Sequence, residues 1–197
     1  MKPSISSAFL ASTLVVGGFS AGAAAQTADF RCPAAGTAFT YKSGDSSSVH
    51  VASGQEGNAC LIESMSGGKT ETVRLHWGLI GSVDAAGESY AGGLDLKTLW
   101  PLKIGNRIQQ TVKATGRDGK PYSSDVTVTV AAYEKITVPA GTFDTFRVEE
   151  SKAGEPVLRT RWWAPSLGTS AKESFPDWTD RSKLKVYDLV AVKPAKP

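Results

Sequence analysis

The feature that most constrains this chain is an alternation of apolar and polar residues with a period of two. Between residues 126 and 132, Val126, Val128 and Val130 share one parity, and Thr127 and Thr129 take the other. Successive side chains of a β-strand point to opposite faces, so this spacing gives a strand one apolar face and one polar face. Valine and threonine are also β-branched residues that strands favour. The chain is therefore suited to strands that each bury one face.

The same alternation recurs along most of the chain. It predicts strands at residues 38–42, 49–51, 60–64, 73–79, 108–115, 126–132, 136–138, 143–149, 157–163 and 184–192. About ten short strands separated by turn residues are typical of an all-β sandwich or barrel. We expect a single all-β domain, formed by a curved antiparallel sheet or an incomplete β-barrel of about ten strands.

Three segments interrupt the strand pattern. Residues 84–93 are rich in glycine, alanine and serine and predict an exposed loop. Residues 94–100 predict a short helical turn. Residues 165–183 predict a long connection that contains Phe175 and Trp178.

The first 25 residues have the pattern of a secretory signal peptide. Lys2 gives a positive start, residues 8–19 are apolar or small and carry no charge, and Ala23-Ala24-Ala25 offers the small residues that signal peptidase requires. The alternative of a retained membrane anchor is disfavoured, because a span needs about 20 apolar residues and no basic flank follows. We expect cleavage before Gln26, a β-rich domain at residues 26–192 and a disordered tail at residues 193–197.

Export determines the expected compartment and partners. The mature protein is predicted to be periplasmic, without an integral membrane segment. The net charge of +3 becomes +2 when Lys2 is removed with the leader, since 3 − 1 = 2. This near-neutral balance gives no electrostatic footprint for nucleic acid, so no nucleic-acid partner is expected.

The chain has two cysteines, Cys32 and Cys60, and export places them where thiols oxidise. We expect a disulfide, which would restrict the unfolded chain by roughly 3–4 kcal/mol in the loop-entropy account. A metal site or a catalytic thiol is the alternative. The two histidines do not fall at ligand spacing from either cysteine, so no metal and no cofactor are predicted.

The segment Val138-Pro139-Ala140-Gly141-Thr142-Phe143 predicts a tight hairpin. Pro139 fixes φ near the value that the first corner of a type I turn needs, and Gly141 can adopt the left-handed conformation that follows. We therefore expect a three-residue loop with a G1 bulge, and a structural role for Pro139 and Gly141.

Three motifs in a fixed order resemble an uncharacterised family of exported bacterial envelope domains. They are Pro101-Leu102-Lys103-Ile104-Gly105, Val138-Pro139-Ala140-Gly141-Thr142-Phe143, and Trp162-Trp163-Ala164-Pro165-Ser166-Leu167-Gly168. These are similar to the P-L-K-x-G, V-P-A-G-T-F and W-Y-A-x-x-x-G segments of that family, with Trp163 in the place of tyrosine. The resemblance spans roughly residues 94–192 and does not cover the half that contains the cysteines. It implies a curved antiparallel sheet or incomplete barrel, and no established catalytic or binding residues.

The strands at residues 143–149 and 157–163 suggest a binding surface. If Val157 lies opposite Glu149, then Arg147 lies across from Arg159 and Phe143 across from Trp163. Opposed arginines cost stability unless an anion relieves them.

The same strand alternation directs the other side chains of residues 157–163. With Leu158, Thr160 and Trp162 toward the core, Arg161 and Trp163 face away from it. The resulting hypothesis is a ligand-binding patch for an anionic glycan or lipid headgroup. Its residues are Arg147, Arg159, Arg161, Trp163 and Phe143. The alternative is a solvated face in which Glu149, Glu150 or Glu155 pair with the arginines.

No group of residues requires catalysis. His50 and His76 occupy the polar parity of their strands without acidic residues at matching spacing, which predicts solvent-exposed histidines. Gly44-Asp45-Ser46-Ser47 is similar to a serine-esterase nucleophile segment, but the cluster is explained as a hairpin loop and no G-x-S-x-G pattern occurs.

The sequence therefore predicts a non-catalytic, periplasmic, envelope-associated protein that binds an amphipathic or anionic envelope molecule, either lipid or glycan. One alternative is a structural or protein-interaction module of the envelope, with a protein partner. A second alternative is a secreted hydrolase that uses Ser46 or Ser47 with His50 or His76, which requires these groups within hydrogen-bond reach.

Overall fold

The computed structural model describes residues 26–83, 94–115, 121–153, 156–177, 179–180 and 182–196. They form one antiparallel sheet and a short 3₁₀ turn, η2 (Lys97–Leu99), where the sequence predicts a helical turn. The strands are β1 (Ala38–Ser43), β2 (Ser46–Glu56), β3 (Ala59–Ser66), β4 (Lys69–His76), β5 (Ile80–Val83), β6 (Arg107–Thr115), β7 (Pro121–Val138), β8 (Gly141–Lys152), β9 (Val157–Ala164), β10 (Thr169–Pro176) and β11 (Leu184–Lys193). The predicted signal peptide and the predicted loop at residues 84–93 lie outside the described residues.

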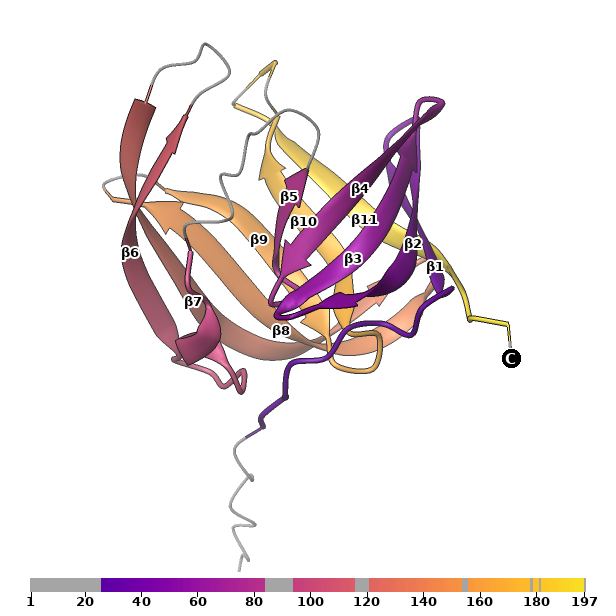
Figure 1. Cartoon of the computed structure of the whole chain (residues 1–197), viewed down its shortest axis with the longest axis horizontal. Helices are drawn as coiled ribbons and strands as arrows, with labels where there is room; N and C mark the ends of the chain where they lie inside the picture. The colour runs from indigo at the N-terminus through magenta and orange to yellow at the C-terminus, as the bar shows by residue number, and fades with distance from the viewer. Residues whose placement is uncertain are drawn as a thin grey trace, which may run out of the picture.

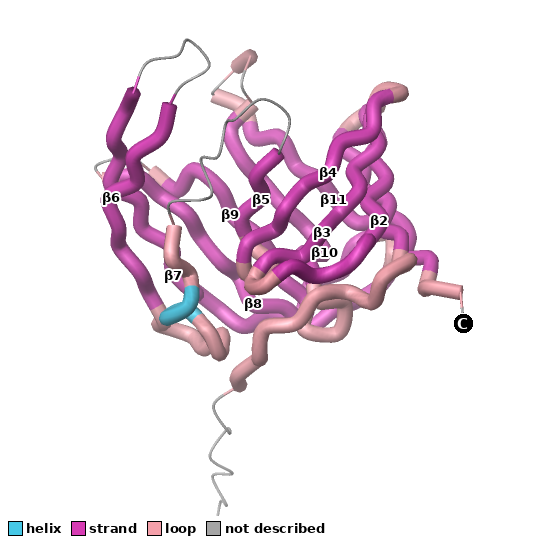
Figure 2. The backbone as a smooth tube through the Cα atoms, in the orientation of Figure 1, coloured by secondary structure: helices cyan, strands magenta, loops and turns pink. Residues whose placement is uncertain are grey.

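The eleven strands follow the order β5-β4-β3-β2-β1-β11-β10-β9-β8-β7-β6. The first and last described strands therefore pair with each other in the middle of the sheet, while β5 and β6 form its two edges and do not pair. Figures 1 and 2 show the sheet curving around a common interior. The prediction of an all-β, single-domain, incomplete barrel is confirmed.

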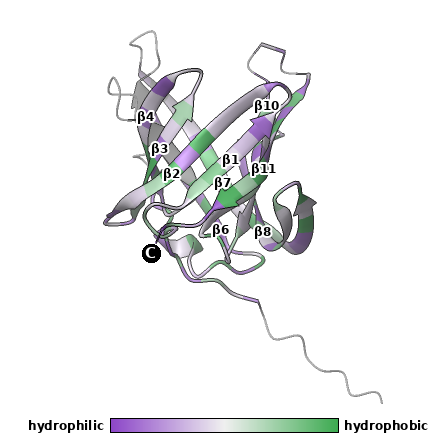
Figure 3. Ribbon diagram, turned by 90° about the vertical axis from the view of Figure 1, so that its right-hand side faces the viewer, coloured by the Kyte–Doolittle hydropathy of each residue, from purple (hydrophilic) through white to green (hydrophobic). Residues whose placement is uncertain are grey.

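Bulges contribute to this curvature. Five of the strand pairings contain a register shift. An extra residue on one strand bends it and increases the local twist, which lets a wide sheet coil without closing. Figure 3 shows hydrophilic and hydrophobic residues interleaved along the strands.

The curved sheet has an inner face, which bears the core, and two ends. The main core cluster joins inner-face residues of β6 to β9 with four leucines in and beside η2. These are Leu94, Leu96, Leu99 and Leu102, none more than 6% exposed. We call this the strap end, because residues 26–37, the strap, also lie there (Figure 2). The opposite end, where β1–β2 and β3–β4 turn, is called the hairpin end.

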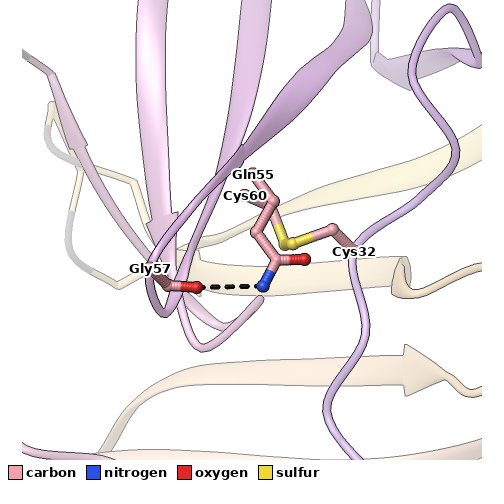
Figure 4. Close-up of a disulfide and its surroundings, with 4 residues drawn as sticks. All are labelled: Cys32, Gln55, Gly57 and Cys60. Atoms are coloured by element: carbon pink, nitrogen blue, oxygen red, sulfur yellow. Dashed lines mark hydrogen bonds between the residues drawn. A yellow bond between two sulfur atoms is a disulfide. The ribbon is translucent and has the colours of Figure 1, made fainter.

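The strap is fixed to three parts of the barrel. Ala28 exchanges two backbone hydrogen bonds with Leu102, at 3.1 and 2.8 Å. A disulfide joins Cys32 to Cys60 on β3, which confirms the predicted bridge (Figure 4). Gly168, in the turn after β9, lies so close to the strap that a Cβ there would be 3.1 Å from the backbone of residues 31–33.

Aromatic rings fill the space between the strap and the sheet. Phe30 packs against Trp77 and Trp100 at centroid distances of 5.3 and 5.5 Å, and Trp100 meets Trp163 edge-on at 5.1 Å. Three of the five tryptophans, Trp77, Trp100 and Trp163, therefore belong to one aromatic cluster with Phe30.

A second cluster joins β1 and β11 to the tip of the β7–β8 hairpin. Val138 pairs with Gly141, which has a φ of +138°, so the predicted hairpin is confirmed. The predicted three-residue loop with a G1 bulge is wrong, because pairing continues to Gly141 and leaves only Pro139 and Ala140 between the paired positions. The Ala140 amide donates to the Leu189 carbonyl at 3.1 Å, so this tip packs on β11.

Several predicted boundaries are wrong. The strand at residues 73–79 ends at His76, because Trp77 takes a positive φ of 53° and the chain reverses into β5. Residues 165–183 contain β10, which the predicted long connection omits. The separate strand at residues 136–138 is the end of β7, and β11 continues through Lys193, the first residue of the predicted tail.

Candidate functional site

The five residues of the predicted patch do not form one surface. Arg161 and Trp163 are buried on the inner face, at 1% and 0% exposure, so the prediction that they face away from the core is wrong. Arg147 lies on the outer face, since it alternates with buried Phe146 and Val148. Phe143 packs in the second cluster, near the turn that joins β7 to β8.

The predicted register of β8 and β9 is also wrong. Glu149 pairs with Thr160 rather than Val157, a shift of three residues (160 − 157 = 3). A bulge between Glu150 and Ser151 produces part of this shift. Arg159 consequently lies opposite Glu150, and Arg147 lies opposite Trp162, so the like charges are not opposed.

On the inner face, Arg161 forms a buried ion triad with carboxylates from both neighbouring strands. Its Nη1 lies 3.3 Å from Glu150 Oε2 on β8, and its Nε lies 3.2 Å from Glu173 Oε1 on β10. The side chains of Arg161 and Glu150 are 2% and 8% exposed, and that of Glu173 is 30% exposed. A buried charge is stable only when it is paired and hydrogen-bonded. The carboxylates of Glu150 and Glu173 therefore replace the water that the Arg161 guanidinium lost on burial.

Toward the hairpin end, two cations and two aromatic rings form a continuous stack, the cation–aromatic stack. The Arg159 Cζ atom lies 4.9 Å from the Phe175 ring centroid, and the Phe175 and Tyr187 rings stack at 5.7 Å with an interplanar angle of 19°. The Lys185 Nζ atom lies 5.5 Å from the Tyr187 ring. All four side chains are intermediate in exposure, so this stack is partly open to solvent.

Strand pairing places the cation–aromatic stack on the inner face. Phe175 pairs with Lys185, and Glu173 pairs with both Arg161 and Tyr187. Directly paired residues share a face, as do residues two apart on one strand. The stack therefore continues the wall of the ion triad toward the hairpin end.

Tyr41 and His50 complete the polar part of the inner face. The buried Tyr41 hydroxyl donates to the Ser170 carbonyl at 2.7 Å, and burial raises the pKa of this phenol well above its usual range. The His50 ring lies 5.0 Å from the Tyr41 ring. Burial lowers the pKa of His50, while the nearby Glu173 carboxylate opposes that shift. The prediction of an exposed His50 is wrong, because its strand parity is that of buried Ala52.

The outer face carries a row of aligned polar residues and one tryptophan, the outer row. It consists of Arg147, Trp162, Lys172 and Asp188, which pair in register across β8 to β11. Trp162 Nε1 donates to Glu134 Oε1 at 2.7 Å, and Arg147 Nε lies 3.3 Å from the same oxygen. Arg147 also pairs with Glu149, as the alternative to the patch foresaw. Lys172 Nζ lies 3.6 Å from Asp188 Oδ1.

The serines and histidines proposed for hydrolysis are not brought together. Ser46 and Ser47 begin β2 beside the Gly44-Asp45 turn, and His50 is four residues after Ser46, about 13 Å along the strand. His76 pairs with Ala59 at the far end of β3 and is half-buried rather than exposed. These pairs lie beyond hydrogen-bond reach, so that version of the hydrolase hypothesis is wrong.

Two features are absent from the described part of the chain. Within it, no three His, Cys, Asp or Glu side chains are grouped so that they could hold a metal ion. Likewise, none of its helices is long and apolar enough to cross a membrane.

Sequence reasoning missed Glu150, Glu173, Phe175, Lys185 and Tyr187 as parts of one wall. The alternation of residues 169–176 is interrupted by the bulge between Ser170 and Lys172, and charged residues at core parity hide the apolar stripe. The signal that could have found them is the repeat of polar and aromatic residues two apart near the ends of three strands.

Comparison with known proteins gives only distant likenesses. No known protein family and no curated protein matches the chain. The structure of the hypothetical lipoprotein YmcC from Escherichia coli K12 aligns at 14% identity and a TM-score of 0.49, covering 82% of this chain and 85% of that one. An exported-protein structure with a YmcC-like fold from Bacteroides fragilis NCTC 9343 aligns at 12% identity and a TM-score of 0.39, covering 84% and 99%. Neither likeness identifies a shared function.

Proposed function

We propose that this chain is a non-catalytic, periplasmic protein of the bacterial envelope that binds an amphipathic molecule on its inner face. The observation that carries this proposal is the polarity gradient along one curved wall. On β9 alone, the inner face passes from fully buried Trp163, through ion-paired Arg161, to half-buried Arg159 near the hairpin end. A molecule with one apolar and one polar part matches such a wall.

Two other observations support the proposal. The sheet leaves β5 and β6 unjoined, so the wall is not a closed ring. The disulfide between Cys32 and Cys60 is a bond that persists in oxidising compartments, which supports the predicted export.

Native mass spectrometry of protein purified from an exporting bacterial host tests the binding. We expect a bound species that organic solvent extracts and that has the mass of an envelope lipid or amphipathic glycan. Val73→Asn places a polar amide on the inner face of β4, and Val49→Asn makes the same change on the outer face of β2. Both valines are half-buried, so the pair is matched in chemistry and exposure.

The two variants should differ in occupancy. Val73→Asn should reduce the bound fraction several-fold, while Val49→Asn should leave it unchanged. Absence of any bound amphipathic species from the wild-type protein, or equal loss in both variants, would overturn the proposal.

A second candidate function is a protein-interaction module, which the outer row favours. Trp162 is only partly buried and lies between Arg147 and Lys172, and tryptophan and arginine dominate interface hot spots. Trp162→Ala should then abolish capture of an envelope protein by crosslinking in intact cells. Unchanged crosslinks would exclude this candidate.

A further inference from the structure

We infer that Gln26 is a modification site, which cyclises to pyroglutamate when the leader is removed and so blocks the N-terminus of the mature protein. This inference rests on the export that the proposed function includes. Cleavage after Ala23-Ala24-Ala25 makes Gln26 the first residue of the mature chain. The new α-amine and the side-chain amide then belong to the same residue.

The cyclisation needs no co-reactant. The lone pair of the α-amine attacks the Cδ carbonyl carbon of the Gln26 side chain, and the new C–N bond closes a lactam ring. The bond from Cδ to the side-chain nitrogen breaks, and that nitrogen leaves as ammonia with a proton taken from the amine. Because the attack is intramolecular, it gains the advantage of proximity. The product has lost the mass of one ammonia and the positive charge of the amine.

The structure leaves Gln26 available for this reaction. The residue is exposed, and its side chain has no hydrogen-bond partner within the described part of the chain. Among the described residues, the first backbone hydrogen bonds of the strap are those between Ala28 and Leu102, at 3.1 and 2.8 Å. The fold therefore holds the strap without engaging its first residue.

The position of the strap explains what a blocked terminus protects. Trimming of the chain through Ala28 would remove its pair with Leu102 and shorten the strap to the residue before Phe30. The Phe30 ring contacts Trp77 and Trp100 at 5.3 and 5.5 Å. Exposed chain ends are where proteolysis concentrates, and aminopeptidases act on a free α-amine, which the lactam lacks.

Intact-mass spectrometry and N-terminal sequencing of protein exported by a bacterial host test this assignment. The wild-type chain should have the mass of residues 26–197 with one disulfide, less one ammonia. Sequencing should be blocked until pyroglutamyl aminopeptidase removes the first residue.

Gln26→Asn is the matched control. It keeps a side-chain amide, but the shorter side chain would have to close a smaller and strained ring. This variant should therefore keep a free N-terminus and lose no ammonia.

A trimming assay measures the protection of the strap. Incubation with an aminopeptidase of broad specificity should leave the mass of the wild-type protein unchanged and shorten the Gln26→Asn chain by one or more residues. Equal behaviour of the two proteins would overturn the protection.

The outcomes separate this inference from the proposed function. A mature chain that begins at Gln26 with a free amine, or that begins at another residue after the leader, overturns the modification and leaves export standing. A chain that keeps residues 1–25 in the exporting host overturns the modification and the periplasmic assignment together. Binding on the inner face is tested separately by the valine variants.

Discussion

The two ends of the inner face use the same strands for different purposes. At the strap end, Trp163 and Leu99 are fully buried, and the strap, the disulfide and the aromatic cluster cover them. At the hairpin end, Phe175 and Tyr187 are half-buried and stack beside cations. The contrast indicates that the strap end supplies most of the apolar burial that stabilises the fold, while the side chains at the hairpin end stay partly exposed to solvent.

The largest expected change in stability comes from replacing one aromatic residue at each end with alanine. Trp163→Ala should lower the free energy of unfolding by about 4 kcal/mol, because it removes a fully buried ring and leaves a cavity. Phe175→Ala should cost about 1 kcal/mol, since its ring is partly solvated. Urea unfolding followed by circular dichroism measures both.

Trp163→Phe is the control for that pair. Within the described residues, Trp163 Nε1 has no hydrogen-bond partner, so replacing indole by phenyl removes a buried donor along with some packing. Its cost should be less than half that of alanine. Equal losses from Trp163→Ala and Phe175→Ala would show that the two ends do not differ.

Loss of the disulfide should affect the strap end next. The paired change Cys32→Ser with Cys60→Ser should lower stability by roughly 3–4 kcal/mol, because a link between residues 28 apart no longer restricts the unfolded chain. Thermal unfolding under oxidising conditions measures the loss. A reductant should destabilise the wild-type protein similarly and leave the variant unchanged, and any other pattern would contradict the assignment.

The ion triad lies between the two ends, and its disruption should rank third. Arg161→Met should cost about 3 kcal/mol, because Glu150 remains buried without its partner while the more exposed Glu173 can regain water. Adding Glu150→Gln to Arg161→Met should recover about half of the loss, since the unpaired charge disappears. No recovery would indicate that packing of the arginine stem, rather than its charge, is what the fold requires.

The smallest expected effect is a pH dependence from His50. Burial lowers its pKa below the ordinary value of 6.5, so the unfolded chain binds more protons than the folded protein as pH falls below 6.5. Stability should therefore decline from pH 6.5 downward, and the His50→Gln variant should show a shallower decline. The His76→Gln variant is the comparison: the pKa of His76 is also lowered, but His76 is less buried, so this variant should flatten the decline less than His50→Gln does. Identical slopes for His50→Gln and the wild-type protein would refute this role for burial.

Local patterns predicted much of the fold. The valine–threonine alternation of β7, the position of the hairpin at Pro139 and the pairing of Cys32 with Cys60 were all confirmed, because each depends on neighbouring residues or on the compartment. Residues 73–79 were misjudged because the apolar alternation continues through Trp77, where the backbone reverses.

The candidate site could be predicted only in part. Arg159 was identified, but the sequence placed it with Arg147, which lies on the other face. Register decided this outcome: an odd shift between β8 and β9, assisted by a bulge, changed which residues meet. Bulges have weak local signals, so strand alternation alone could not locate the wall.

The sequence by itself determined that the chain forms strands with one apolar face each, where most of them turn, and which cysteines pair. Only the tertiary structure decided that β1 joins β11, that Arg161 is buried between two carboxylates, and that Arg159, Phe175, Tyr187 and Lys185 share one wall. The physical reason is that side-chain alternation acts within a strand, whereas strand order, register and curvature arise from contacts between residues far apart in the chain.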